Sequence, residues 1–229
     1  MNNKYLVSII IPAYNEENII FETITTLQND RFIKSIKHEI IVIDDGSTDK
    51  TAYNAQKTGV TVIKHGKNFG KGEALKTGIH YSSGDVTVFL DADVGDSSTE
   101  IIKIIKPVIN GDADVSIAKF GKAKRKGGFG VIKFISRYGT RLLTGKSIES
   151  VLSGQRALRS DIAKELHIAK GYGAEVGMTI DLLRKGYRII ECEVHMHHNE
   201  TGRDINGFLH RGRQLMDILR TLIAKLFQK

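Results

Sequence analysis

The sequence predicts an α/β fold in which helices flank a mostly parallel sheet. Two observations lead to this fold class. Short runs of β-branched residues alternate with helical patterns along the first half of the chain, which is typical of successive strand–helix–strand units. Several of the predicted strands also run directly into polar, turn-forming residues. The length of 229 residues suits one domain with a sizeable core, and 41% hydrophobic residues exclude a mainly disordered chain.

The predicted strands are apolar runs of the kind found where a sheet is covered on both faces. The first occupies residues 6–11 and ends at Pro12. The other strands are expected at residues 39–43, 60–64, 86–90, 114–118 and 187–194.

The predicted helices follow residues that can cap or open a helix. Residues 15–18 precede a first helix that ends at about Asn29, the turn at 44–49 opens a helix to about Thr58, and residues 70–72 open one to about Ser82. Later helical patterns cover residues 98–109, 131–143, 161–166, 174–185 and 208–227. The basic, glycine-rich segment 119–130 is expected to be a loop.

The net charge of +8 is unevenly distributed and points to an anionic partner. No acidic residue occurs between Asp114 and Glu149, and a second basic stretch begins at Arg203. We do not expect nucleic acid to be that partner, because carboxylates at the strand ends would repel its phosphates and no nucleic-acid-binding motif is visible. The single cysteine, Cys192, excludes an intrachain disulfide and a cysteine-based zinc site.

We expect a cytoplasmic protein. No apolar run reaches the roughly 18 residues needed to span a bilayer, and the first residues do not form a signal peptide. Peripheral contact with the inner membrane surface is the alternative that we keep open.

Polar turns at residues 12–16, 44–47 and 91–93 follow three of the predicted strands. In a parallel sheet such turns meet at one rim, where ligands bind. The Asp91-Ala92-Asp93 turn is the most informative of them, because carboxylates at i and i+2 can approach one hard cation or one ribose. A divalent cation at this position would neutralise a departing diphosphate.

These turns carry a resemblance to a known family. Residues 10–17, 42–49, 68–72 and 90–93, in this order, resemble the family 2 glycosyltransferases of the Rossmann-like GT-A fold, and the resemblance covers about the first half of the chain. The second half resembles more loosely the dolichyl-phosphate-mannose synthases and glucosyl-3-phosphoglycerate synthases, at residues 153–158, 171–175 and 198–204.

The resemblance implies roles for individual residues. Those in contact with the nucleotide sugar would be Pro12, Tyr14, Glu16, Ile43, Asp45, Lys71, Asp91, Ala92 and Asp93. Those near the diphosphate or the acceptor would be Lys119, Arg137, Gly154, Arg156 and Arg203. Mg²⁺ or Mn²⁺ would be bound by Asp93 and by a late histidine, with His198 the best placed and His195 and His197 as alternatives.

The implied reaction is metal-dependent transfer of a hexose from a nucleotide sugar, of the UDP-glucose type, to a phosphorylated or acidic acceptor. An inverting reaction needs a carboxylate base, for which Glu175 is the first choice and Asp181 the second. Many family members carry an adjacent Glu-Asp pair in this region and this chain does not, so a retaining reaction stays open. The alternatives are transfer to a polyprenyl phosphate or glycolipid at a membrane surface, and a nucleotidyltransferase-like protein that binds nucleotide sugars.

We expect residues 1-205 to form the GT-A domain and residues 206-229 to form a C-terminal amphipathic helix. Apolar residues at helical spacing, interspersed with Arg and Lys, would let this helix pack on its own domain, on a second subunit of a homodimer, or on a membrane surface.

Overall fold

The computed structural model describes residues 5–121, 130–169, 171–196 and 205–228, with the side chains of the last segment described from residue 212 onward. Its strands form one sheet in the order β3-β2-β1-β4-β6-β5-β7. They are β1 (Leu6–Ala13), β2 (Lys37–Asp44), β3 (Thr61–Lys64), β4 (Val86–Phe89), β5 (Val115–Phe120), β6 (Arg156–Arg159) and β7 (Ile189–Val194). Every neighbouring pair is parallel except the two that involve β6, which confirms the predicted fold class.

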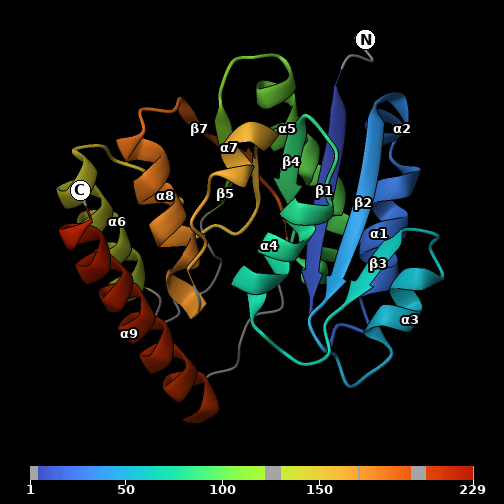
Figure 1. Cartoon of the computed structure of the whole chain (residues 1–229), viewed down its shortest axis with the longest axis horizontal. Coiled ribbons are helices and arrows are strands. Elements are labelled where there is room, and N and C mark those ends of the chain that lie inside the picture. The colour runs from blue at the N-terminus through green and yellow to red at the C-terminus, as the bar shows by residue number, and fades with distance from the viewer. Residues whose placement is uncertain (1–4, 122–129, 170, 197–204, 229) are drawn as a thin grey trace.

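Helices cover both faces of this sheet (Figure 1). They are α1 (Ile20–Asn29), α2 (Arg31–Ser35), α3 (Thr51–Gln56), α4 (Lys71–Tyr81), α5 (Ile102–Ile109), α6 (Gly130–Thr144), α7 (Ser160–Lys164), α8 (Ala174–Arg184) and α9 (Ile205–Phe227), with 3-10 segments η1 (Ala92–Ile101) and η2 (Gly171–Gly173). Side chains of β1 alternate between two apolar cores, Ile9 and Ile11 facing α1 and α5, and Ile10 facing α4 and α8.

The structure departs from the predicted elements at four places. The first helix ends at Asn29 as predicted, but Asp30 then caps an additional helix, α2, since its carboxylate accepts from the amides of Phe32 and Ile33 at 2.7 and 3.1 Å. The helix predicted from residue 98 is preceded by η1, in which Asp93 and Gly95 have non-helical backbone angles. The third departure, β6, had no counterpart in the predicted strands. The fourth concerns the segment 119–130, which was expected to be a loop: Lys119 and Phe120 belong to β5, and residues 122–129 lie outside the described residues.

Strand β6 matters for function because it runs against its neighbours. Its first residue, Arg156, pairs with Phe89 at the end of β4 and with Ile117 in β5. The residues just before β6 therefore reach the rim where the parallel strands end, which is the rim on which sites of such folds lie.

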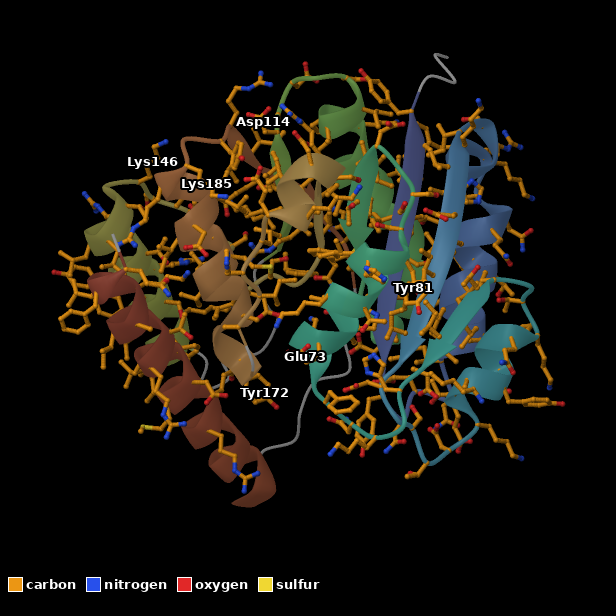
Figure 2. The ribbon with its side chains drawn as sticks, viewed as in Figure 1. Glu73, Tyr81, Asp114, Lys146, Tyr172 and Lys185 are labelled. Atoms are coloured by element: carbon orange, nitrogen blue, oxygen red, sulfur yellow. The ribbon has the colours of Figure 1, made fainter. Side chains whose placement is uncertain are left out.

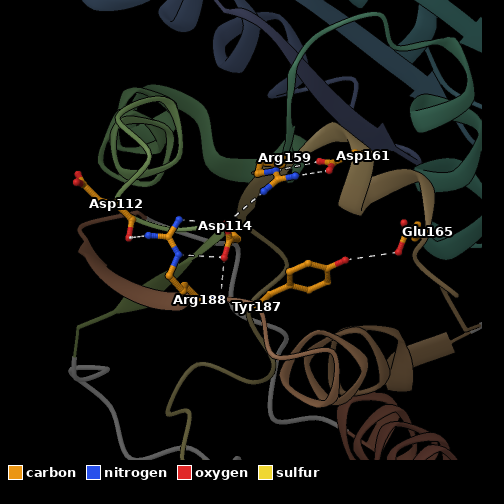
Figure 3. Close-up of polar contacts among 7 residues, drawn as sticks. All are labelled: Asp112, Asp114, Arg159, Asp161, Glu165, Tyr187 and Arg188. Atoms are coloured by element: carbon orange, nitrogen blue, oxygen red, sulfur yellow. Dashed lines mark hydrogen bonds and ion pairs between the residues drawn. The ribbon is translucent and has the colours of Figure 1, made fainter.

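At the opposite rim of the sheet, just before β5 begins, charged groups surround Asp114 (Figure 3). Its carboxylate accepts from the backbone amide of Arg188 at 2.9 Å, and Arg188 Nη2 lies 3.2 Å from Oδ1. Arg159 Nη1 approaches the same oxygen at 3.5 Å. Hydrogen bonds from Arg188 hold the pKa of Asp114 below its usual value. In Figure 2 Asp114 lies at the other end of the molecule from Glu73 of α4 and Tyr172 of η2. The network therefore stabilises the fold at the rim where β5 begins, away from the rim where the parallel strands end.

The terminal helix α9 packs on η2, α8 and α6. Its Ile218 is fully buried, and Lys225 forms a 2.6 Å ion pair with Asp181 of α8. Within the described part of the chain, no helix is long and apolar enough to cross a membrane.

Candidate active site

A cavity of about 320 Å³ opens at the carboxyl ends of β1, β2 and β4. Its walls come from the three predicted turns and from the start of α4. The lining residues are Pro12, Ala13, Tyr14, Glu16, Asp45, Asn68, Gly70, Lys71, Ala74, Asp91, Ala92 and Asp93. The strand-end turns therefore meet at one rim, as parallel topology requires.

Lys71, at the start of α4, joins two carboxylates at this cavity. Its Nζ lies 2.6 Å from Oδ1 of Asp91 and 3.4 Å from Oε1 of Glu175, which belongs to the first turn of α8. Burial alone would lower the pKa of Lys71, but the charges of Asp91 and Glu175 more than compensate and raise it. The other oxygen of Asp91 accepts from Nε2 of Gln155 at 2.8 Å. Lys71 and Gln155, from two segments distant in sequence, thus hold Asp91 in a fixed orientation.

Glu16 shares the cavity with Asp91 and Asp93. Burial, with the negative charges of Asp93, Asp49 and Asp91, raises the pKa of Glu16 from 4.5 to about 7. The wall formed by these residues is therefore strongly acidic, and an added cation would be favoured there.

Asp45 supports the loop between β3 and α4. Its buried carboxylate accepts from the backbone amides of Phe69 and Gly70 at 3.0 and 2.7 Å, and lies 2.7 Å from Nδ1 of His65. The other ring nitrogen of His65 lies 2.9 Å from the hydroxyl of Thr77. Asp45 lines the cavity as expected, but these contacts show that it also fixes the loop that forms one of its walls.

The donor set of the cavity fits a divalent cation. In the described ranges of the chain, no three or more His, Cys, Asp or Glu side chains form a ready metal site. Mg²⁺ is usually bound by one or two carboxylates, with substrate phosphates and water as the remaining ligands. Asp93 supplies a carboxylate for this arrangement, whereas both oxygens of Asp91, on the same turn, already contact Lys71 and Gln155.

Comparison with known proteins shows the family to which this chain belongs. Residues 8–166 match the family model described as "Glycosyl transferase family 2". The chain belongs to this family. The matched range includes every turn that lines the cavity.

Two curated relatives of this glycosyltransferase are informative. Glucosyl-3-phosphoglycerate synthase of Mycobacterium tuberculosis is 28% identical over 196 residues, which cover 76% of this chain and 60% of the synthase. Dolichol-phosphate mannosyltransferase of Pyrococcus furiosus is 37% identical over 126 residues, which cover 53% of this chain and 34% of that protein. The chain thus spans less than two thirds of either relative.

A crystal structure of the M. tuberculosis synthase, in complex with Mn²⁺, UDP and phosphoglyceric acid, superposes with a TM-score of 0.83 at 24% identity. The match covers 97% of this chain and 78% of that one. The glycosyltransferase therefore has the GT-A fold expected from its sequence over almost its whole length.

Three predicted nucleotide-sugar or acceptor residues lie apart from the cavity. Ile43 is fully buried in the core of the sheet. Lys119 binds the carboxylate of Glu149 at 3.0 Å, and Nε of Arg137 donates to the carbonyl of Glu149 at 2.7 Å. Neither cation lines the cavity described above.

Arg156 was expected to face an anion, but its side chain is only 1% exposed. Its Nε donates to the carbonyl of Ser153 at 2.9 Å, and Nη2 donates to those of Val151 and Glu175, each at 3.0 Å. Burial lowers the pKa of Arg156 to about 10. The structure thus makes Arg156 a clamp between the segment before β6 and the start of α8.

Of the two carboxylates proposed as a base, Glu175 reaches the Lys71–Asp91 pair and Asp181 is held by Lys225. The backbone amide of His195 donates to Glu100 at 2.8 Å, and its side chain is exposed. His197, His198 and Arg203 lie outside the described residues, so their predicted roles stay predictions.

The prediction missed the contributions of Asn68, Ala74 and Gln155 to the site. Asn68 belongs to the motif at 68–72, and its place in that motif was the available signal. Gln155 lies in the motif at 153–158, but nothing in the sequence shows that β6 is antiparallel and delivers it to Asp91.

Gly154 packs so closely against the Lys71–Asp91 pair that no larger side chain fits at this position unless Lys71 moves. A Cβ atom at this position would lie 2.5 Å from Lys71 Nζ and 3.2 Å from an Asp91 oxygen. We expect Gly154→Ala to displace the ammonium and to lower kcat/KM about 10²-fold, the effect of misplacing a catalytic group by about 1 Å. Lys71 is flexible, so the melting temperature should change little.

The matched control is Gly121→Ala, where a Cβ would meet no atom within 4 Å. Both variants are compared by donor turnover and by thermal denaturation. Full activity in Gly154→Ala would show that the Lys71–Asp91 contact is not needed for turnover.

The raised pKa of Glu16 predicts how stability depends on pH. With a pKa of 4.5 unfolded and about 7 folded, Glu16 keeps its proton in the folded state at pH values where the unfolded chain has lost it. The folded state then binds more protons, so its contribution to the unfolding free energy falls as pH rises through this window and levels off above it.

Glu16→Gln should remove this part of the pH dependence without abolishing folding. Urea denaturation of the metal-free protein at several pH values measures the slope, with Glu73→Gln in the first turn of α4, outside the cavity lining, as control. An identical slope in Glu16→Gln and in the unmodified protein would contradict the assigned pKa.

Proposed function

We propose that this glycosyltransferase moves a hexose from a UDP-sugar of the UDP-glucose type to a phosphorylated or otherwise acidic acceptor, with Mg²⁺ or Mn²⁺ as cofactor. The observation that carries the proposal is the convergence of Lys71, Asp91 and Glu175 beside a cavity built by the nucleotide-binding motifs. The sequence relation to glucosyl-3-phosphoglycerate synthase supports the choice of donor and acceptor.

In this proposal each turn at the rim binds a different part of the nucleotide-sugar donor. Pro12, Tyr14 and the loop fixed by Asp45 bind the nucleoside, and Asp91 faces the ribose or the sugar. Asp93 holds the divalent cation, which would supply positive charge to the departing diphosphate. Lys71 adds a second positive charge at the same wall of the cavity.

The reaction breaks the bond between the anomeric carbon and a diphosphate oxygen and forms a bond from that carbon to an acceptor oxygen. In an inverting reaction the acceptor proton passes to Glu175, whose carboxylate lies within 3.4 Å of Lys71. In a retaining reaction Glu175 instead orients Lys71 and the sugar. Both courses place Glu175, and not Asp181, at the reacting centre.

Binding of the nucleotide is tested by thermal denaturation with UDP, GDP and ADP, each with and without Mn²⁺. We expect UDP with Mn²⁺ to raise the melting temperature most, because binding to the folded state stabilises it. Hydrolysis of a panel of UDP-sugars then identifies the sugar. A protein that responds to none of the three nucleotides would contradict a nucleotide-sugar donor.

The second candidate acceptor is a polyprenyl phosphate. It is favoured by the 37% identity to dolichol-phosphate mannosyltransferase over 126 residues. Parallel assays with a glycerate phosphate and with a short-chain polyprenyl phosphate decide between the two acceptors, since only the true acceptor should increase UDP release above the rate of hydrolysis.

A further inference from the structure

Helix α6 exposes an apolar stripe that the fold does not use. Its side chains form three arcs around the helix axis. The first arc, which includes Ile132, packs on the core. The second arc is apolar and exposed, with Leu142 72% accessible, and it comprises Val131, Phe134, Tyr138 and Leu142. The rings of Phe134 and Tyr138 stack at 5.9 Å. The third arc carries the exposed bases Lys133, Arg137 and Arg141.

Helix α9 has the same construction. Ile218 is buried, and Leu215 and Leu222 pack against the core. On the outer side Phe227 is 80% accessible, and the exposed apolar residues described here are Met216, Ile223, Leu226 and Phe227. Two bases, Arg213 and Arg220, are exposed beside them.

The two stripes lie next to each other. The helices run side by side at the edge of the molecule (Figure 1), and Leu222 of α9 packs directly on Gly139 of α6. At helical spacing, the exposed apolar arcs of both helices flank this contact on its solvent side. We call the eight exposed apolar residues of the two helices the outer face. Such a continuous apolar surface indicates an interaction site.

Charge favours one partner for the outer face. The exposed ionisable groups of the described parts of α6 and α9 are mainly cationic. The acid Asp217 faces Gly171 and pairs with Arg220 at 3.7 Å, and Glu149 beyond α6 pairs with Lys119. A two-fold dimer would bring identical patches together and so oppose their positive charges. An anionic bilayer instead offers an apolar layer beneath negative charge.

We propose that the outer face of α6 and α9 docks this glycosyltransferase on an anionic lipid surface. The apolar side chains enter the acyl boundary and the flanking Lys and Arg side chains bind the headgroups. Docking of this kind is peripheral, and it does not depend on which acceptor the enzyme uses.

The test is flotation with vesicles of phosphatidylcholine alone or with about 30% phosphatidylglycerol, at low salt and at about 0.5 M NaCl. We expect binding to the anionic vesicles only, and weaker binding at high salt. Replacing Phe134, Leu142, Ile223 and Phe227 together by serine should reduce the bound fraction at least about tenfold. Lys133→Gln with Arg141→Gln should weaken binding to anionic vesicles without exposing or removing apolar surface.

The matched control is Tyr53→Ser with Tyr81→Ser, which removes equally exposed aromatic rings from α3 and α4 and should leave flotation unchanged. Melting temperatures verify that each variant is folded. Equal binding to neutral vesicles, or binding unaffected by the serine substitutions, would overturn the proposal. So would absence of flotation, or a stable dimer in light scattering that the same substitutions dissociate.

Discussion

Asp93→Ala is expected to abolish metal-dependent turnover while leaving the fold intact. Asp93 lines the acidic wall of the cavity and is the proposed ligand of the divalent cation. Stabilisation of a leaving diphosphate by a metal contributes several kcal/mol, so its loss should lower kcat about 10³-fold or more. The side chain is not part of either hydrophobic core, so the melting temperature of the free protein should change by little.

Binding measurements separate this effect from a general loss of the site. We expect Mn²⁺ to stop enhancing the stabilisation by UDP in Asp93→Ala, while UDP alone still stabilises the variant. Asp96→Ala is the matched control, because Asp96 lies in the same segment η1 but is exposed and does not line the cavity. An Asp93→Ala protein with normal activity would eliminate the metal assignment.

Arg156→Ala is expected to be the most destabilising of the substitutions considered. It removes the donors of three hydrogen bonds to carbonyls, two of them buried, and leaves a cavity in a side-chain site that is only 1% exposed. Each buried carbonyl left without a partner costs about 1–3 kcal/mol, so we expect the unfolding free energy to fall by about 3–5 kcal/mol.

Arg156→Ala should also lower kcat more than it weakens UDP binding. The clamp joins the segment that carries Gly154 to the backbone of Glu175, whereas the nucleoside wall belongs to β1 and β2. Arg156→Lys should recover part of the stability because it restores one donor group. Arg159→Met, in the same strand but half-exposed, should cost less than about 1 kcal/mol. An equal loss of unfolding free energy in Arg156→Ala and Arg159→Met would contradict the role of Arg156 as a clamp.

The sequence predicted the parts of the site that follow from strand topology. Polar turns after β1, β2 and β4 must meet at one rim, and they do. Glu175 was the first choice for a carboxylate base in the motif at 171–175, and the structure brings it to Lys71. The domain division at residue 205 stays a prediction.

Burial and long-range pairing could not be predicted from the sequence. Arg156 has the chemistry of an anion ligand, and only the antiparallel course of β6 shows that it points into the interior. Asp181 was a plausible base until its partner Lys225, 44 residues later, was placed beside it. Strand β6 has the sequence Arg-Ala-Leu-Arg, which lacks the β-branched apolar run that marked the other strands, so the segment that orients Asp91 was missed.

The central position of β6 also bears on how the chain folds. In the described sheet it alone connects the block β3-β2-β1-β4 to the pair β5-β7. The first block is made of residues close in sequence, so forming its contacts requires the closure of short loops only. The pair β5-β7 can join this block only after residues 156–159 have paired with β4. We therefore expect two cooperative units, with amide exchange in β5 and β7 occurring at lower free energy than in β1 and β2. The candidate active site, which includes Gln155 and Glu175 from the later unit, would then be assembled last.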